Sequence, residues 1–368
     1  MMNVSAERVR RQIANVLTAW GMAPELVETT ADMMVETDLL GVDSHGVSML
    51  MAYERLRDAG GLNLQARPRV VKDTPCAALV DGDAGLGHPV SALAMNLAVD
   101  KALAVGVGVV GVRNSHHFGA AGVYARLAAE RGAIGLVASA TRGIMMVPTG
   151  GAEPVLGTNP IAFAAPAGRN RPFVLDMATT TVAANKVKVH DLKEKPVPAG
   201  WVVDGAGGTA TDPREAMRLL HERKEGGLSP LGGTPEMGSH KGYGLAMMVH
   251  ILGGTLSGAS FSPIRKRTQK PGDPENIGHF FQAIDPKLFL EEGRFEADLD
   301  EAIDVLHATP PADPEKPVLV AGEPEDLERA RRVRDGIPIP PALDRHLRDI
   351  CGRCGAAYVL EQMEAPAA

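Results

Sequence analysis

Apolar residues recur at helical spacing near the start of the chain. One set predicts an amphipathic helix over residues 5–20, and a second set predicts another helix that Gly41 ends. The first set is Val9, Ile13, Val16, Leu17 and Trp20, and the second is Leu26, Val27, Met33, Met34 and Leu40. The chain therefore opens with a helical pair.

The pattern changes after Ala77 to short apolar runs separated by Ala-rich helical stretches. Strands are predicted over 77–82, 107–112 and 134–140, with helices over 92–104 and 124–132 between them. Residues 150–215 are rich in Gly, Pro and Thr, with strand candidates over 161–166 and 173–178. This alternation is typical of an α/β fold.

The last third of the chain mixes buried and polar segments. Leu245, Met248, Val249 and Leu252 have helical spacing and predict a buried helix, whereas charge, Pro and Gly make residues 262–277 a solvated loop. A polar helix over 323–335 ends at Gly336 and the prolines that follow, and a short helix closes the chain.

These elements predict a helical unit built from both chain ends and an α/β region between them. The expected boundaries are 1–70 with 325–368 for the helical unit and 71–324 for the region that binds cofactor and substrate. Residues from about 150 to 215 are a candidate separate subdomain.

Composition narrows the functional class. Hydrophobic residues make up 45% and charged residues 23%, as in ordinary globular proteins. A formal charge of -7 argues against a nucleic-acid partner, which needs a concentrated positive field. The first residues run directly into a helix, and no apolar run has the length of a membrane span, so we expect a cytoplasmic protein without a signal peptide.

The cysteines and one glycine motif carry no chemistry in our interpretation. Three cysteines suit a reducing compartment, and the CxxC of Cys351 and Cys354 lacks a second ligand pair, which favours a structural role. Gly106, Gly108 and Gly111 satisfy GxGxxG, but a helix precedes them and the strand follows. A Rossmann fingerprint needs the opposite order, so any dinucleotide is expected to bind through a different structural element.

Histidines in Gly-flanked polar segments are the strongest chemical signal. Five of the eleven histidines lie in such segments: His45, His116, His117, His240 and His279. A single loop histidine is more often a solvated or capping residue, but several together favour a shared pocket. Imidazole titrates near neutral pH, so it can give a proton to a forming alkoxide or take one from an alcohol.

Two further segments suggest anion or ribose contacts. Lys241 precedes an apolar helix, where its ammonium could meet a phosphate or carboxylate, although a plain surface lysine is the alternative. Asp176 ends a predicted strand before Thr179, Thr180 and Thr181, whose hydroxyls suit ribose or phosphate oxygens. A helix N-cap is the alternative there, and it is compatible with anion binding.

Taken in order, these segments resemble the type 2 malate/L-lactate dehydrogenase family, which also contains ureidoglycolate, sulfolactate and diketogulonate dehydrogenases and cyclic imino-acid reductases. The resemblance covers about residues 5–340. It is carried by DSHGVSML, NSHHFGAAGVYA, LGTNPIAFAAP, LDMATTTVAANK, GWVVDGAGGTATDP, SPLGG, SHKGYGLAMMVHILGGTLSGASF, FFQAIDP and AGEPED.

The resemblance implies a fold, a cofactor and a set of site residues. It implies an NAD- or NADP-binding fold without the Rossmann fingerprint, a homodimer whose sites draw on both subunits, and a small carboxylate substrate. His117 is expected to be the acid/base and His45 to contact substrate or cofactor, with the reverse assignment open. The implied cofactor-binding residues are Thr141, Asp176, Met177, Ala178, Thr179, Thr180, His240, Lys241, Gly322, Glu323 and Pro324. Asn159 is expected near the substrate.

One departure from the family pattern concerns the substrate. Many members carry Arg three residues after the DSHG histidine, where a guanidinium can hold a carboxylate with two hydrogen bonds. This chain has Ser48 there. A single hydroxyl cannot replace the charge, so simple malate or lactate is not the expected substrate, although Ser48 remains a candidate substrate contact. Tyr53 and Arg142 are the candidate substitutes for the arginine, and for each a structural role is the stronger interpretation.

The expected reaction is hydride transfer between a nicotinamide and a small 2-hydroxy or 2-keto acid. Reduction of a cyclic imine is the alternative within the family. From another class, clustered His, Asp and Glu would suit a metal-dependent hydrolase or lyase, although no HxH, HExxH or paired CxxC spacing supports a metal. A member that only binds dinucleotide is a third possibility.

Overall fold

A seven-stranded mixed sheet forms the centre of the computed structural model, which describes residues 2–260, 270, 273 and 275–361. The strand order is β2-β3-β4-β10-β5-β6-β7, and only β3 and β4 pair in parallel. The strands are β2 (Arg69–Asp73), β3 (Ala77–Asp81), β4 (Val107–Ser115), β5 (Ile134–Ala140), β6 (Ile161–Ala165), β7 (Phe173–Met177) and β10 (Ile277–Ile284). The runs predicted over 77–82, 107–112, 134–140, 161–166 and 173–178 are therefore strands.

Strand β10 was not predicted, although it occupies the middle of the sheet. Phe281 pairs with Val110 of β4 on one side and with Val137 of β5 on the other, both antiparallel. Most of β10 is buried, so it lacks the apolar-polar alternation that identifies a half-exposed strand.

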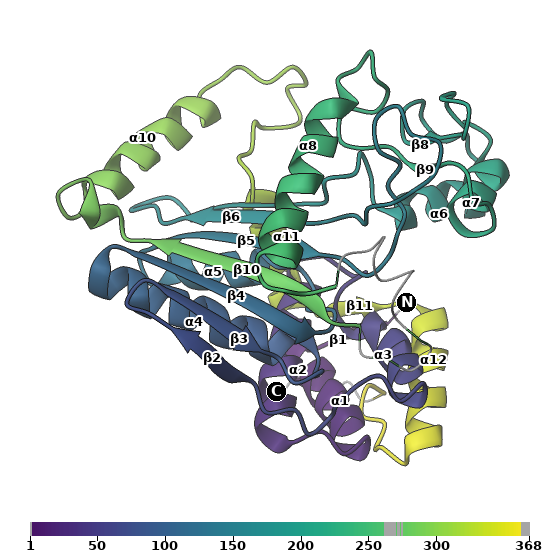
Figure 1. The fold of residues 1–368 in the computed structure, drawn as a ribbon, viewed down its shortest axis with the longest axis horizontal. Helices are drawn as coiled ribbons and strands as arrows, with labels where there is room; N and C mark the ends of the chain where they lie inside the picture. The colour runs from purple at the N-terminus through teal and green to yellow at the C-terminus, as the bar shows by residue number, and fades with distance from the viewer. Residues whose placement is uncertain (1, 261–269, 271–272, 274, 362–368) are drawn as a thin grey trace, which may run out of the picture.

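Helices cover both faces of this sheet. Helices α4 (Gly87–Val105) and α5 (Ala121–Glu130) pack on one face, and α8 (Ser239–His250) with the π-helical turn η2 (Ile251–Thr255) packs on the other (Figure 1). Gly106 ends α4 at φ +93°, and β4 begins at the next residue. A Cβ on Gly108 would meet the Lys101 side chain of α4 at 2.9 Å. The GxGxxG glycines thus serve a helix end and close helix-strand packing.

The two chain ends form one helical unit, in agreement with the expected fold. Its apolar core joins residues from 4 to 86 with residues from 337 to 360. Its helices are α1 (Ala6–Ala19), α2 (Pro24–Leu39), α3 (Leu50–Asp58) and α12 (Pro341–Cys354) (Figure 1). Between α2 and α3 lies the short 3-10 turn η1 (Val47–Met49).

A two-stranded sheet within this unit was not predicted. Strand β1 (Met2–Val4) pairs antiparallel with β11 (Ile337–Ile339), and Asn3 lies opposite Pro338. We interpreted the prolines around 338 only as a helix stop. Proline is tolerated in an edge strand where its missing N–H is not needed, and a two-stranded sheet has only edges.

A smaller lobe carries its own apolar cluster. It contains α6 (Ala184–Leu192), α7 (Pro213–His221), β8 (Val202–Val203) and β9 (Gly227–Leu228). The cluster comprises Val182, Val187, Val197, Val202, Ala216, Leu219 and Leu228. It overlaps the proposed subdomain of about 150–215 and extends beyond it to β9.

Two further helices lie between strands β10 and β11 in the chain. Helix α10 (Arg294–His307) follows the turn η3 (Pro286–Leu288), and α11 (Glu323–Asp335) leads into β11. Most of the loop expected over 262–277 lies outside the described residues. The prediction of a buried helix was wrong for one face of α8, because Met248 is 38% exposed there while Ala246 and Val249 are buried. No described helix is long and apolar enough to cross a membrane.

Candidate active site

Two histidines from distant segments meet beside the end of the sheet. His45 lies in the loop between α2 and η1, and His117 follows β4 directly. Their ring centroids are 5.4 Å apart, and both side chains are half-buried. The structure therefore brings together the two histidines that the sequence singled out for catalysis.

A buried carboxyl group supports the loop that carries His45. Asp38, at the end of α2, accepts a hydrogen bond from the backbone N–H of Val47 at 2.8 Å. Burial raises the pKa of Asp38 to about 8, although the bond from Val47 acts in the opposite direction. A Cβ on Gly46 would overlap the carboxyl group of Asp38. The glycine beside His45 is thus required for this close packing.

The ring of His117 is held by two groups at the same nitrogen. The hydroxyl of Tyr53 lies 2.8 Å from Nδ1, and the backbone N–H of Gly119 donates to Nδ1 at 3.3 Å. Tyr53 is fully buried on α3 and its pKa is raised by burial. Its direct contact is therefore with His117, and its burial argues against the expected role of Tyr53 as a substitute for the family's arginine.

His45 contacts a hydroxyl group, which can either donate or accept a hydrogen bond. The hydroxyl of Ser44 lies 2.7 Å from Nδ1 of His45. Burial lowers the pKa of His45, and it lowers that of His117 further, with added contributions from nearby His45, His88 and Arg142. Both rings are consequently neutral at rest near neutral pH.

Three more histidines surround this pair, and sequence reasoning missed one of them. His88 of α4 is fully buried, and neither ring nitrogen has a hydrogen-bond partner among the described residues. Its ring lies 5.8 Å from that of Tyr53, and burial lowers its pKa to about 3. It follows Gly87, so the glycine-flanked pattern would have included it.

His279 and His116 support the segment that carries His117. His279 of β10 contacts Ser139 Oγ through Nδ1 at 2.8 Å and the carbonyl of His116 through Nε2 at 3.2 Å. Its ring stacks on Phe118 at 4.5 Å. His116 turns away from His117's partners and contacts the carbonyl of Gly61 at 2.9 Å. Both rings are buried, so their role here is to hold the segment.

An arginine with its carboxylate lies next to the histidines. Arg142 follows β5 and pairs with Glu275 at 2.7 Å. Burial alone would raise the pKa of Glu275, but its bond to His116 and the charge of Arg142 outweigh burial and lower it. Burial is the main cause of the shifts at Tyr53 and His117, but the guanidinium charge partly opposes the rise in the pKa of Tyr53 and adds to the fall in the pKa of His117, so it acts on the site. The Arg142 side chain remains 49% exposed.

Asn159 joins three segments of the site. Its Oδ1 accepts from the N–H and the hydroxyl of Thr141 at 3.2 Å each, and its Nδ2 donates to the carbonyl of Ala246 on α8 at 3.0 Å. Its own carbonyl accepts from the hydroxyl of Thr179 at 3.0 Å. Asn159 is buried with φ +34°, a conformation that asparagine tolerates well. These contacts of Asn159 are structural.

Asp176 belongs to strand β7, and its side chain lies against the start of helix α5. It accepts a hydrogen bond from the N–H of Gly122 at 2.7 Å, and a Cβ on Gly122 would lie 2.9 Å from the Asp176 side chain. Part of the residue is exposed, but the dense protein around the carboxyl group raises its pKa to about 6, although the bond from Gly122 acts in the opposite direction. Met177 and Ala178 follow half-buried, and the Thr180 hydroxyl donates to the carbonyl of Val182 at 2.8 Å.

The start of α11 lies against strand β7. Gly322 has φ +97°, and a Cβ there would meet the backbone of Val174 at 3.1 Å. Glu323 accepts from the N–H of Val320 at 2.8 Å and contacts His307 at 2.9 Å, and Pro324 occupies the first turn of α11. The expected residues from 322 to 324 and from 176 to 180 thus belong to neighbouring segments.

His240 and Lys241 lie in the first turn of α8 and are exposed. The N–H of Gly242 donates to the carbonyl of Leu231 at 3.1 Å, and the N–H of Leu231 donates to the carbonyl of Thr179 at 2.9 Å. These bonds connect the start of α8 to the threonine segment, so it too adjoins the expected cofactor residues.

The chemistry of these groups fits a dinucleotide. The exposed carboxylate of Asp176 suits ribose hydroxyls, and Lys241 at a helix N-terminus suits a phosphate. The hydroxyls of Thr179 and Thr180 are buried and already donate to backbone carbonyls, so their contacts hold the segment itself. Backbone packs tightly at Gly122 and Gly322, so the chain can hold these segments close to one another. The segments that the family resemblance assigns to the cofactor therefore lie next to one another, and Asp176 and Lys241 have the chemistry that the role requires.

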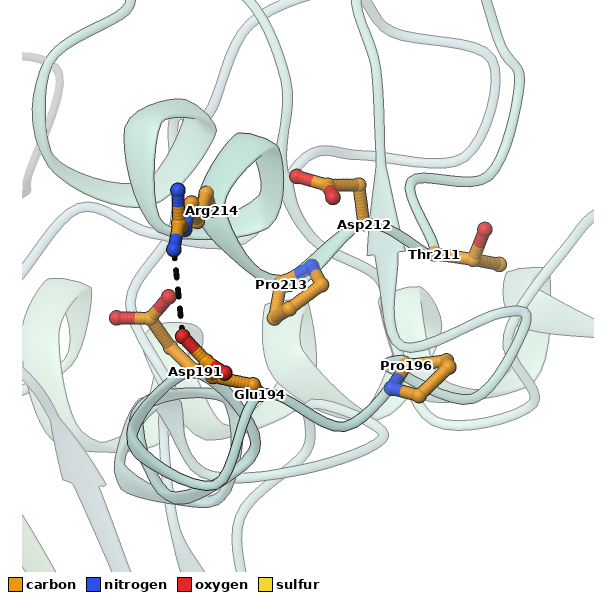
Figure 2. Close-up of a pocket in the computed structure, with 7 residues that line it drawn as sticks. All are labelled: Asp191, Glu194, Pro196, Thr211, Asp212, Pro213 and Arg214. Atoms are coloured by element: carbon orange, nitrogen blue, oxygen red, sulfur yellow. Dashed lines mark hydrogen bonds and ion pairs between the residues drawn. The ribbon is translucent and has the colours of Figure 1, made fainter.

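Figure 2 shows a surface hollow elsewhere, on the small lobe. It has a volume of about 400 Å³ and is lined by residues of α6, α7 and the chain between them, including an ion pair of Arg214 with Glu194 at 3.3 Å. None of the expected site residues lines it. Among the described residues no three His, Cys, Asp or Glu side chains are grouped to hold a metal ion.

Comparison with known proteins places these features in a family. A family model described as malate/L-lactate dehydrogenase matches residues 4–348. The chain is 40% identical to malate dehydrogenase of Pyrococcus horikoshii, covering 96% of this chain and 95% of that protein. It is 37% identical to L-sulfolactate dehydrogenase of Methanocaldococcus jannaschii, covering 96% of this chain and 98% of that protein. It is 32% identical to ureidoglycolate dehydrogenase (NAD(+)) of Escherichia coli K12, covering 94% of this chain and 95% of that protein.

Solved structures agree with the sequence comparison. The structure of malate dehydrogenase from Pyrococcus horikoshii OT3 matches with a TM-score of 0.85, 37% identity and coverage of 97% of this chain and 96% of that one. The structure of delta1-piperideine-2-carboxylate reductase from Pseudomonas syringae pvar. tomato matches with a TM-score of 0.81, 29% identity and coverage of 95% and 100%.

Proposed function

The chain belongs to the malate/L-lactate dehydrogenase family, and from this premise we propose that it is an NAD(P)-dependent oxidoreductase acting on a small 2-hydroxy or 2-keto acid. The observation that carries the proposal is that the rings of His45 and His117, from segments far apart in the sequence, lie with their centroids 5.4 Å apart. Imidazole groups handle the proton that must accompany hydride transfer.

Different residues of the chain would bind the cofactor and contact the substrate oxygen. When bound, the nicotinamide supplies or accepts the hydride. The cofactor would be held by Thr141, Asp176 to Thr180, His240 and Lys241, and Gly322 to Pro324. The rings of His45 and His117 face the substrate oxygen and are supported by Ser44, Tyr53 and Gly119.

We propose that Arg142 holds the substrate carboxylate. The hydroxyl of Ser48 donates to the carbonyl of Asp43 at 2.6 Å within its own loop, and it carries no charge. Arg142 is exposed, lies close enough to affect the pKa of His117, and offers the planar fork that pairs with a carboxylate. In this proposal Arg142 replaces the arginine that many relatives carry at position 48.

The protein is proposed to act as a homodimer in the cytoplasm. Ile251 and Leu256, on the same segment as Met248, are 52% and 64% exposed, and a second copy would cover such an apolar surface. The three cysteines are unpaired, which suits a reducing compartment. Sedimentation equilibrium should give twice the mass of one chain, and Ile251→Asp should shift the mass towards one chain.

Reduction of a cyclic imine is a second candidate, because a solved reductase of that type shares the fold over nearly the whole chain. An absorbance screen at the nicotinamide band, with NADH and NADPH against 2-keto acids and cyclic imines, separates the two. Oxidation of cofactor by keto acids alone supports the first candidate. Oxidation by imines alone supports the second, and no oxidation in either series would refute both.

A further inference from the structure

We propose that Arg332, in the last turn of α11, is a positioning residue that fixes the loop carrying His45. This His45 loop comprises residues 40–46, between α2 and η1. The proposal rests on the proposed oxidoreductase function, because it concerns a loop that faces the substrate in that function. Arg332 acts through Asp43 and Asp38, and it needs no contact of its own with the substrate.

The guanidinium group of Arg332 is buried and donates hydrogen bonds from all three of its nitrogens. The side chain is 6% exposed. Nε donates to Glu328 at 2.5 Å, and Nη1 donates to the backbone carbonyl of Asp38 at 2.7 Å. Nη1 and Nη2 each donate to one carboxylate oxygen of Asp43, the latter at 3.2 Å. Two bonds to one carboxylate fix its direction as well as its distance, so Asp43 is held in one orientation.

These bonds hold the His45 loop at two points. Asp43 lies within the loop, two residues before His45. Asp38 lies at the end of α2, and its carboxyl group accepts from the N–H of Val47, the residue that follows the loop. Arg332 therefore ties the middle of the loop to Asp38, which already binds the far end of the loop.

A cation is needed at this place because carboxyl groups gather around it. Arg332 bonds directly to the carboxylates of Asp43 and Glu328. Burial is the largest cause of the raised pKa of Asp38, the charge of Asp43 adds to the rise, and the charge of Arg332 opposes it. Without the guanidinium group, the carboxylates of Asp43 and Glu328 would repel each other with no cation between them. The His45 loop would then move away from α11.

The expected cofactor end of α11 has anchors of its own. The backbone at Gly322 lies close against Val174 of β7, and Asp326 is buried and pairs with Arg126 of α5 at 3.0 Å. Roughly 14 Å of helix separate the first residue of α11 from Arg332. Loss of the Arg332 bonds should therefore release the His45 loop and leave the expected cofactor residues in place.

Arg332→Gln tests the proposal, and Arg329→Gln is its matched control on the same helix. Arg329 donates to both carboxylate oxygens of Glu36 on α2, at 2.7 and 3.2 Å, and these bonds reach the helix rather than the loop. Arg332→Gln should lower kcat/KM for a 2-keto acid about 10- to 100-fold and leave NADH affinity, measured by fluorescence, within about twofold. Arg329→Gln should stay within about twofold in both measurements. Equal losses in the two variants, or a parallel loss of NADH affinity in Arg332→Gln, would overturn the proposal.

Two further variants separate the geometry of this contact from its charge. Lysine keeps the positive charge but lacks the planar fork, so Arg332→Lys should lose nearly as much kcat/KM as Arg332→Gln. Asp43→Asn weakens the contact from the loop side, on a side chain that is 62% exposed, so the fold should survive and kcat/KM should fall. Because both residues act through one contact, the double variant should lose no more than Arg332→Gln alone. Wild-type activity in Arg332→Lys or Asp43→Asn, or additive losses in the double variant, would contradict the positioning role.

Amide hydrogen exchange tests the loop without any substrate. The N–H groups of His45 and Val47 are hydrogen-bonded in the wild-type fold. Both should exchange about tenfold faster or more in Arg332→Gln and at the wild-type rate in Arg329→Gln. Equal rates in the wild type and Arg332→Gln would overturn the proposal. If no keto acid or imine oxidises the cofactor in the wild-type protein, the proposed function fails, whereas the exchange rates still decide whether Arg332 holds the loop.

Discussion

Replacing Arg142 by glutamine removes the charge and the planar fork that we propose to hold the substrate carboxylate. A hydrogen bond to a charged partner contributes about 1.5–3 kcal/mol, which corresponds to roughly a 10- to 150-fold fall in kcat/KM. Glu275 already neutralises part of the guanidinium charge at 2.7 Å, so we expect the lower half of that range.

The assay compares a 2-keto acid with its neutral amide while following the nicotinamide absorbance. Arg142→Gln should reduce kcat/KM for the acid and leave the amide nearly unchanged, and NADH affinity measured by fluorescence should stay the same. Ser48→Ala is the matched control, because its hydroxyl bonds only within its loop. The effect of this control should stay within about twofold.

Two results would refute the reasoning. Equal losses on the acid and the amide would show that Arg142 supports the fold of the site rather than the carboxylate. A large loss in Ser48→Ala with little change in Arg142→Gln would return the carboxylate contact to the position that many relatives use.

Three further outcomes follow from other contacts. Gly122→Ala places a Cβ 2.9 Å from Asp176, and we expect NADH affinity in a fluorescence titration to fall about tenfold or more; unchanged affinity would separate Asp176 from the cofactor. Gly352→Ala, in α12 with open space around it, should raise the free energy of unfolding by about 1 kcal/mol in urea, and a loss would contradict the packing. Bonds from Arg331 and Arg332 lower the pKa of Glu328 to about 2, so its contribution to stability is present above its ordinary value of 4.5 and is lost as pH falls towards 2. Urea unfolding of Glu328→Gln should therefore differ most from wild type near neutral pH and converge with it in acid, and a constant difference would exclude this linkage.

Local patterns were sufficient for most elements of the fold. Helices α1, α2, α4 and α5 and strands β3 to β7 follow from periodicity, because each has one face or one run that only burial explains. The rejection of the GxGxxG motif also needed only local order, since Gly106 ends a helix and β4 starts after it. The resemblance to a family, now established by comparison, came from the order of short motifs.

Long-range pairing was beyond the reach of local patterns. Strand β10 is buried on both faces between β4 and β5, and β1 pairs with a proline-containing strand more than 300 residues away, so neither leaves a local signature. His88 does carry a local signal, the adjacent Gly87, but its contacts with Tyr53 and Gly119 are visible only in the fold.

Residue types in the sequence were thus sufficient to propose the reacting groups, because glycine-flanked imidazoles and a carboxylate beside threonines limit the possible chemistry. Only the tertiary structure shows that His45 and His117 meet, which groups contact the ring of His117, and that Arg142 lies near it. The physical reason is that these contacts join groups far apart in the sequence: the ring of His117 is contacted by the hydroxyl of Tyr53, from α3, and by the N–H of Gly119, from the loop after β4.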